Sequence, residues 1–158
     1  MNDVQFVKFA FARIITDEFA ILSEEYDPQQ QASMNVAMAF GFNPFERAFG
    51  IQVKCFVLVQ NKPIAVIAVT CQFQIAPEDW TALYAEKTNT LAVPKAIALH
   101  FASLAVSTTR GVLHAKTERH PINVLIIPPI DVSDFIKSEL VLNSSQMTPE
   151  QAPHTVRV

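Results

Sequence analysis

The chain has 158 residues, half of them hydrophobic and 17% charged, and its formal net charge is −3 at pH 7. This length predicts one domain with a core large enough to fold without disulfides or metal ions. The charged fraction is below the roughly 25% of an average soluble domain, so the chain has more apolar surface than one small core can hide. The negative charge argues against nucleic acid as a partner, because a protein that binds the phosphate backbone usually has a basic face.

Apolar segments in the first half of the chain predict four antiparallel strands. They cover about residues 4–25, 34–42, 47–60 and 63–76. The first segment is one long bent strand or two short ones, and Asn61-Lys62 is the predicted turn between the last two. The last two segments are apolar at nearly every position, which is typical of strands covered on both faces. The domain's own helix covers one face, and the other face needs a partner or a substrate.

The second half predicts one long helix and one or two short ones. A helical turn is expected over residues 81–86, and the main helix runs from Pro94, a residue type favoured at a first helical position, to Arg110, with Gly111 as its stop. A last short helix begins at Asp131 and reaches about residue 142. We therefore expect a single α+β domain over residues 1–142, with a four-stranded antiparallel sheet. The Ser, Gln and Pro content of residues 143–158 predicts a disordered tail.

The main helix is apolar on nearly every side, so it must be buried between layers or between subunits. Alanines at positions 96, 98, 102 and 105 allow another backbone to approach it closely. This pattern predicts a homo-oligomer, a dimer or a tetramer, that handles other polypeptide chains. The apolar run over residues 91–106 is shorter than the roughly 20 residues that cross a bilayer, so membrane insertion is not expected.

The N-terminal residues lack the basic segment, apolar segment and small-residue cleavage site of a secretory signal, so a cytoplasmic location is expected. Cys55 and Cys71 are the two cysteines of the chain, and both lie in apolar strand segments. Thiols in such segments are commonly buried and inert, because desolvation by apolar neighbours raises their pKa.

No pattern in the chain predicts an enzyme, a cofactor or a metal site. A phosphate-binding loop or a dinucleotide fingerprint needs clustered glycines, and the three glycines of this chain are far apart. The four histidines, His100, His114, His120 and His154, do not have the spacing of metal ligands. Surface or partly exposed histidines are the interpretation that this spacing favours.

Most of the phenylalanines lie in the strand half of the chain, where such residues fill interiors. Their number exceeds what one sheet face under a single helix accommodates, so a groove that binds apolar segments is predicted. The candidates for client contact or subunit contact are Phe40, Phe42, Phe45, Phe49, Phe56 and Trp80. The sequence does not divide these two roles among them. Acidic residues near the first strand, including Glu18, form a solvated edge or a docking surface for a basic partner.

The order of these elements resembles the SecB family of export chaperones. The pieces that carry the resemblance are Arg13-Ile14-Ile15-Thr16, Phe73-Gln74-Ile75-Ala76, Arg110-Gly111 and Pro128-Pro129-Ile130-Asp131, within residues 4–142. The resemblance implies a cytosolic, ATP-independent holdase that assembles into tetramers as dimers of dimers. It also implies hydrophobic grooves that hold unfolded precursor proteins, which are then passed to the motor ATPase of the secretion pathway.

Two departures from the family pattern stand out. Glu18 matches one carboxylate of the family's motor-docking surface, but its partner positions fall on the apolar Leu22 and Val66, which argues against docking to that ATPase. The segment over residues 112–118 is longer than the corresponding turn in familiar members, so the chain resembles a divergent branch. Some relatives in the family serve toxin–antitoxin systems instead of general export.

Three functions stay open at the level of the sequence. The first is a holdase for unfolded or precursor polypeptides, which requires an open apolar groove. The second is a small-molecule or acyl-chain binding protein, or an enzyme, which requires an enclosed apolar pocket with convergent polar groups. The third is a chaperone dedicated to one partner, of the toxin–antitoxin type.

Overall fold

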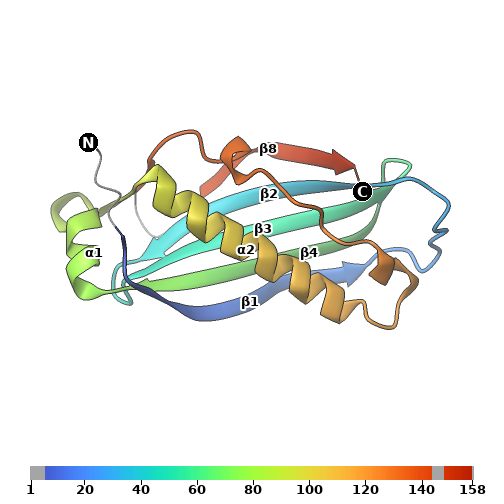
Figure 1. Ribbon diagram of the computed structural model, residues 1–158, viewed down its shortest axis with the longest axis horizontal. Coiled ribbons are helices and arrows are strands. Elements are labelled where there is room, and N and C mark those ends of the chain that lie inside the picture. The colour runs from blue at the N-terminus through green and yellow to red at the C-terminus, as the bar shows by residue number, and fades with distance from the viewer. Residues whose placement is uncertain (1–5, 144–147, 158) are drawn as a thin grey trace.

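The computed structural model describes residues 6–143 and 148–157 of the chain. A five-stranded antiparallel sheet with the order β1-β4-β3-β2-β8 carries one long helix, α2, that lies diagonally across one of its faces (Figure 1). The strands are β1 (Phe9–Ile21), β2 (Ala32–Asn43), β3 (Ala48–Val59), β4 (Lys62–Ile75) and β8 (Thr148–Arg157). The predicted fold class, an α+β fold with a four-stranded antiparallel sheet, a long helix and short helices, is confirmed, and β8 is an addition to it.

The first predicted segment forms one strand, β1, which is shorter than the expected range. Its pairing with β4 shifts register at two places, between Phe11 and Arg13 and between Thr16 and Glu18. Such bulges bend a strand and increase its twist, so of the two sequence-based alternatives the single long bent strand is the one that forms. Residues 4 and 5 of the predicted range lie outside the described residues.

The hairpins fix which side chains share a face of the sheet. β2 and β3 pair without a shift from Ala32 opposite Val59 to Asn43 opposite Ala48. The β3–β4 turn consists of Gln60 and Asn61, both with positive φ (51° and 62°), which is the geometry of a two-residue hairpin loop. The predicted turn is therefore wrong by one residue, because Lys62 already pairs with Val59.

One face of the sheet forms the core of the domain. On β2 the side chains of alternate residues from Met34 to Phe40 are buried, and those between them are half-buried. On β4, by contrast, every residue from Ile64 to Cys71 is buried. The sequence predicts that this strand is covered on both faces. On the face opposite α2, part of that cover comes from side chains of the neighbouring strands: Glu18 and Lys54 are both register partners of Ala68 and form an ion pair with each other.

α2 (Lys95–Lys116) is longer than predicted, and Gly111 lies inside it in open space. The helix ends at Thr117, whose hydroxyl donates to the Leu113 carbonyl at 2.8 Å, and the Asn123 amide donates to the His114 carbonyl at 2.8 Å. These side chains satisfy terminal carbonyls that would otherwise be left to water, so the helix does not need a glycine cap at position 111. The predicted stop at Gly111 is therefore wrong.

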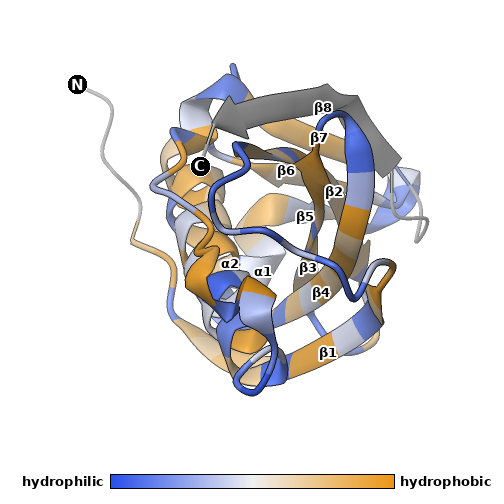
Figure 2. Cartoon of the chain, turned by 90° about the vertical axis from the view of Figure 1, so that its right-hand side faces the viewer, coloured by the Kyte–Doolittle hydropathy of each residue, from blue (hydrophilic) through white to orange (hydrophobic). Residues whose placement is uncertain are grey.

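By length and composition α2 could cross a membrane. In the structure, however, its apolar side is buried, including Ile97, Phe101, Ala105 and Leu113. Figure 2 shows α2 on the concave side of strands β1 to β4, together with a second, small sheet. This is the environment of a core helix in a folded domain.

The small sheet has the order β5-β6-β7 and consists of β5 (Tyr84–Ala85), β6 (Thr90–Val93) and β7 (Leu140–Asn143). The short helices are α1 (Pro77–Leu83) and the 3₁₀ turns η1 (Glu86–Thr88), η2 (Pro121–Val124) and η3 (Val132–Asp134). The helical turn predicted over residues 81–86 is displaced toward Pro77, which occupies the first turn of α1.

The last predicted helix, from Asp131 to about residue 142, is wrong in its length and in its end. The Asp131 carboxylate accepts from the Ser133 amide at 2.9 Å, as a capping residue does, but the helix that follows is the single turn η3. Leu140 and Leu142 are buried and Val141 is exposed, which is the alternation of a strand, and they form β7.

β8 lies at residues where the sequence predicts a disordered tail. It pairs with β2 from Arg157 opposite Ser33 to Thr148 opposite Phe40, with a register shift between Val36 and Met38. Pairing to an open strand edge uses backbone groups and needs no apolar side chains, which explains the difference from the sequence-based expectation. Residues 144–147 and 158 lie outside the described residues.

Arg110 joins α2 to the extended segment over residues 125–130. Its guanidinium donates from Nε to the Ile127 carbonyl at 2.6 Å and from a terminal nitrogen to the Pro128 carbonyl at 3.0 Å. We expect Arg110→Met to lower the free energy of unfolding by about 1.5–3 kcal/mol, because two carbonyls lose a charged donor. Urea denaturation checks this value against Ser107→Ala, a change at an exposed position of the same helix. Equal stability of Arg110→Met and Ser107→Ala would contradict a structural role for these bonds.

Candidate functional site

An apolar strip on β1 is exposed beside α2. Phe9, Phe11 and Ile14 are the register partners of Ile75, Phe73 and Cys71, which are buried residues of β4. Cross-strand partners point to the same face of a sheet, so the strip lies on the side that carries α2. Its side chains nevertheless remain 37%, 40% and 54% exposed.

The diagonal course of α2 explains this exposure (Figure 1). One flank of the helix is tied to the segment over residues 125–130 by Arg110. On the other flank, the Thr108 hydroxyl lies close enough to the thiol of Cys71, the strand partner of Ile14, to lower its pKa, and Lys116 lies 5.5 Å from the Phe19 ring centroid. Between these contacts the helix does not cover the middle of β1. The side chains of the strip therefore stay open to solvent beside the helix.

At its N-terminal end the strip opens into a hollow of about 300 Å³ on one side of Phe9 and a second, more apolar hollow of about 220 Å³ on the other. The second hollow is lined by Phe6, Val7 and Phe9 from the start of the chain and by Ala96, Ile97, His100 and Phe101 from α2. We call this second hollow, together with the strip Phe9, Phe11 and Ile14, the β1–α2 groove.

Stacked aromatic rings form the floor of the β1–α2 groove. The Phe73 and Phe101 rings are parallel with centroids 4.5 Å apart, and Phe9 meets Phe101 edge-on at 4.7 Å. Phe11 lies 4.8 Å from Phe73. Aromatic pairs in these arrangements contribute about 0.5–1.5 kcal/mol each beyond the area that they bury. The exposed rings are thus held in fixed positions by buried ones.

The six aromatic residues predicted for client or subunit contact lie in different places. Phe40 and Phe49 are completely buried in the core, and Phe42 and Trp80 are nearly so, in a cluster with Tyr84. Phe56 is half-buried on the other face of the sheet, below the Lys54 ammonium group.

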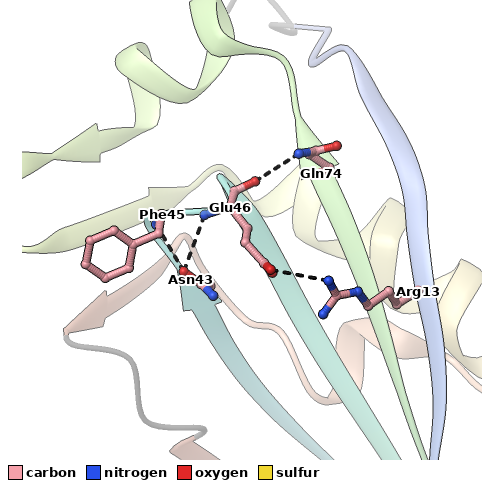
Figure 3. Close-up of polar contacts among 5 residues, drawn as sticks. All are labelled: Arg13, Asn43, Phe45, Glu46 and Gln74. Carbon is pink, nitrogen blue, oxygen red and sulfur yellow. Dashed lines mark hydrogen bonds and ion pairs between the residues drawn. The ribbon is translucent and has the colours of Figure 1, made fainter.

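Phe45, the sixth, is 94% exposed at the tip of the β2–β3 hairpin. The Asn43 side chain accepts from the backbone amides of Phe45 at 3.0 Å and of Glu46 at 3.4 Å (Figure 3). Gln74 donates to the Glu46 carbonyl at 3.2 Å, and Arg13 pairs with the Glu46 carboxylate at 3.3 Å. A well-ordered turn therefore presents this ring to solvent. The contact roles of the six residues stay predictions.

Comparisons with known proteins give one informative result. The chain matches no model of a known protein family, and no curated protein sequence matches it. Among solved structures it is similar to Rv1957, a SecB-like chaperone of Mycobacterium tuberculosis in complex with a ChAD peptide from the Rv1956 HigA1 antitoxin. The TM-score is 0.50 at 15% sequence identity, over 77% of this chain and 90% of that one.

The fold is SecB-like. At 15% identity the likeness shows the fold alone. It covers most of both chains, so it extends beyond a shared hairpin or a single helix. The resemblance proposed from the order of elements is thus supported at the level of a distant SecB-like fold.

Glu18, the carboxylate that matches the SecB docking surface, lies on the sheet face opposite α2 and is already engaged. It accepts from the Lys54 ammonium group at 2.6 Å, with both side chains partly exposed. Leu22, one of the apolar positions beside it, is exposed, and Val66 is buried. A basic partner at this face would have to compete with Lys54 for Glu18. Docking through Glu18 stays a prediction.

No described residues form a site for catalysis with a metal ion. Among the residues whose side chains the structure describes, no three or more His, Cys, Asp or Glu side chains lie close enough together to hold one. His100 is exposed beside the Phe9 ring, at 5.8 Å between centroids, and His120 accepts from the Ile122 amide through Nδ1. His100 thus serves packing and His120 serves capping.

Both cysteines are free and buried, as predicted. Burial raises the pKa of Cys55 to about 12, and it raises the pKa of Cys71 to about 11 although the Thr108 hydroxyl lowers it. Since the thiolate is the reactive form, we expect iodoacetamide at pH 8 to leave both thiols unmodified in the folded protein. Mass spectrometry checks this against the protein unfolded in guanidinium, where both should be alkylated. Alkylation of the folded protein at the same rate would contradict the burial.

The contact candidates predicted from the sequence do not include Phe9, Phe11 and Ile14, the strip residues of the β1–α2 groove. Alternation along a strand predicts which side chains share a face, but not how much of that face a crossing helix covers. The one available signal was the concentration of apolar residues in an edge strand, where they are harder to bury than in a central strand.

Proposed function

We propose that this protein is a chaperone that binds extended apolar segments of non-native or partner polypeptides in the β1–α2 groove, without a nucleotide. The observation that carries the proposal is the exposure of Phe9, Phe11 and Ile14 in a row beside an uncovered flank of α2. Large contiguous apolar surface on a folded domain commonly marks a binding site. The SecB-like fold supports the same interpretation.

Burial of apolar surface predicts weak client binding that depends little on the sequence of the client. Burial of about 300 Å² of apolar surface contributes about 7 kcal/mol at 25 cal/mol per Å², before the entropic cost of ordering the client. One groove alone then gives modest affinity. An oligomer that presents several grooves to one client would gain affinity through avidity.

We propose a homo-oligomer for this reason, a dimer or a tetramer. Two surfaces suit contact between copies: the long edge strand β1, and the outward side of α2, where Ser103, Ser107 and Gly111 are exposed and small. A cytoplasmic location and a role in export belong to the same proposal. Transfer of clients to the secretion motor would require a surface that replaces the engaged Glu18.

A dedicated chaperone for one partner, such as an antitoxin, is the second candidate. It is favoured by the structural neighbour, which is solved with a peptide from an antitoxin. An acyl-chain carrier fits less well, because the apolar hollow opens to solvent along exposed residues such as Phe6 and Phe9.

Aggregation of a reduced, denatured client tests the proposal. In the absence of ATP, light scattering should fall as the protein is added in excess over the client, and addition of ATP should change nothing. Unaltered aggregation of several unrelated clients, with tight binding to one antitoxin peptide, would favour the dedicated role. Co-purification of a lipid in native mass spectrometry, with no effect on aggregation, would favour the carrier.

A further inference from the structure

Arg47 lies at the end of the β2–β3 turn with its backbone in the left-handed region, at φ 49°. Its amide donates to the Pro44 carbonyl at 3.4 Å, and its carbonyl accepts from the Ile75 amide at 2.8 Å. A non-glycine residue keeps this conformation only where the surroundings hold it there, and such positions concentrate at functional sites. The backbone from which the Arg47 side chain projects is therefore fixed at both sides.

The guanidinium of Arg47 has no counter-ion among the described residues. Its Nε is buried without a hydrogen-bond partner there, and it takes part in no ion pair. A buried donor without an acceptor is costly, and for a charged group the cost is larger. The terminal nitrogens of Arg47 also have no partner among the described residues, and unlike the shielded Nε they are not buried. They are therefore the donors that an acceptor in the open hollow beside Arg47 would meet.

The carboxylates next in the chain to Arg47 and to Pro77, which lines the same hollow as Arg47, are engaged elsewhere. Glu46, its neighbour in the chain, pairs with Arg13 at 3.3 Å. Glu78 pairs with the Lys8 ammonium group at 3.7 Å, and Asp79 accepts from the Lys8 amide at 2.7 Å. Each of these acidic side chains therefore has a partner, and Arg47 is left without one.

An open hollow of about 300 Å³ lies in front of Arg47. Lys8, Phe9, Gln74 and Pro77 are among the residues that line it with Arg47. Phe9 also lines the hollow of the β1–α2 groove, so the basic hollow and the apolar one share this residue. An extended polypeptide rises about 3.3 Å per residue. If it places an apolar side chain in the groove, a side chain or terminal carboxylate one or two residues further along that polypeptide reaches Arg47.

We propose that Arg47 binds a carboxylate of the polypeptide held in the β1–α2 groove. The protein then prefers segments in which an acidic group follows an apolar anchor by one or two residues. This inference rests on the proposed function. The carboxylate comes from an Asp or Glu side chain or from the C-terminus of the partner, since a guanidinium binds both in the same way.

Synthetic peptides test the preference and its source. A fluorescent, extended ten-residue peptide with a Phe-rich centre is made in three forms. The first has Glu two residues after the centre and the second has Gln at that position, and both end in an amide. The third ends at a Phe of the centre with a free C-terminal carboxylate. Fluorescence anisotropy at 50 mM salt should show roughly tenfold tighter binding of the acidic peptide than of the Gln peptide. A gain for the free C-terminus with none for Glu would identify the terminal carboxylate as the ligand.

Arg47→Gln should bind all forms equally, at the affinity that the unmodified protein has for the Gln peptide. Arg119→Gln is the matched control: it removes the same charge from an exposed arginine just beyond α2, and should keep the tenfold preference. In the unmodified protein the preference should shrink at 500 mM salt, because a partly exposed ion pair is screened. This salt dependence decides the question if Arg47→Gln does not fold.

Equal binding of acidic, neutral and C-terminal peptides by the unmodified protein would overturn the assignment of Arg47 and leave the proposed function intact. The assignment also fails if Arg47→Gln retains the preference, or if the preference does not change with salt. If the protein binds none of the peptides and also does not bind an unfolded protein at the same concentrations, both the proposed function and this inference are overturned.

Discussion

Replacement of Phe11 and Ile14 by serine should weaken binding of an unfolded polypeptide by about tenfold or more. Both side chains are largely exposed in the β1–α2 groove, so their loss removes apolar contact area from the complex. A loss of about 1.4 kcal/mol is enough for a tenfold change in the dissociation constant. Fluorescence anisotropy with a labelled, reduced client measures the effect.

The matched control is the pair Val124→Ser and Val141→Ser. These two side chains are 66% and 56% exposed and lie outside the groove. The control should bind the client as the unmodified protein does. If both double variants lose affinity equally, binding depends on the general apolar character of the surface, and the groove has no special role.

Phe101→Ala should lower the free energy of unfolding by about 3–5 kcal/mol. The Phe101 side chain is completely buried, and its ring contacts Phe73 at 4.5 Å, Phe9 at 4.7 Å and Phe49 at 5.7 Å. Truncation leaves a cavity between α2 and the sheet that these rings cannot fill without moving. Since small domains are stable by about 5–15 kcal/mol, this is a large share of the total.

Urea denaturation followed by circular dichroism gives the change in unfolding free energy. Ser103→Ala, at an exposed position two residues further along the same helix, should leave the unfolding free energy within about 0.5 kcal/mol of that of the unmodified protein. A loss of less than about 1 kcal/mol for Phe101→Ala would mean that α2 is not packed on the sheet as described.

The sheet could be predicted from the sequence because its signals are local. Continuous apolar runs and turn residues such as Asn61 indicate strands and hairpins directly, and the predicted turn differs from the observed one by only one residue. The end of α2 could not be predicted in this way. Gly111 is a local stop signal, but the helix continues because Thr117 and Asn123, which lie further along the chain, satisfy its terminal carbonyls.

Pairing between distant segments accounts for the other differences. β7 pairs with β6, almost fifty residues earlier, in register from Leu140 opposite Val93 to Asn143 opposite Thr90. Capping signals at Asp131 favour a helix, but four residues with period-two burial pair with an existing strand instead. β8 likewise depends on the open edge of β2. Local propensity does not contain such information.

The candidate groove shows the same limit. The sequence predicts an apolar groove, and aromatic residues are the natural candidates to line it. Two of those candidates, Phe40 and Phe49, nevertheless lie in the core. Phe9, Phe11 and Ile14 are exposed because α2 crosses the sheet diagonally and leaves part of β1 uncovered; Figure 1 shows this diagonal course. That angle depends on packing of side chains from several elements, which a single segment does not determine.

Site-specific photocrosslinking tests most directly whether a polypeptide occupies the β1–α2 groove. Benzoylphenylalanine is introduced at His100, an exposed residue that lines the groove on α2, and in a separate variant at Val124, which is exposed elsewhere. With an unfolded client and no nucleotide, illumination should give a crosslinked product at position 100 and little at position 124. Crosslinks of equal yield at both positions, or at position 124 alone, would contradict the proposed mode of binding.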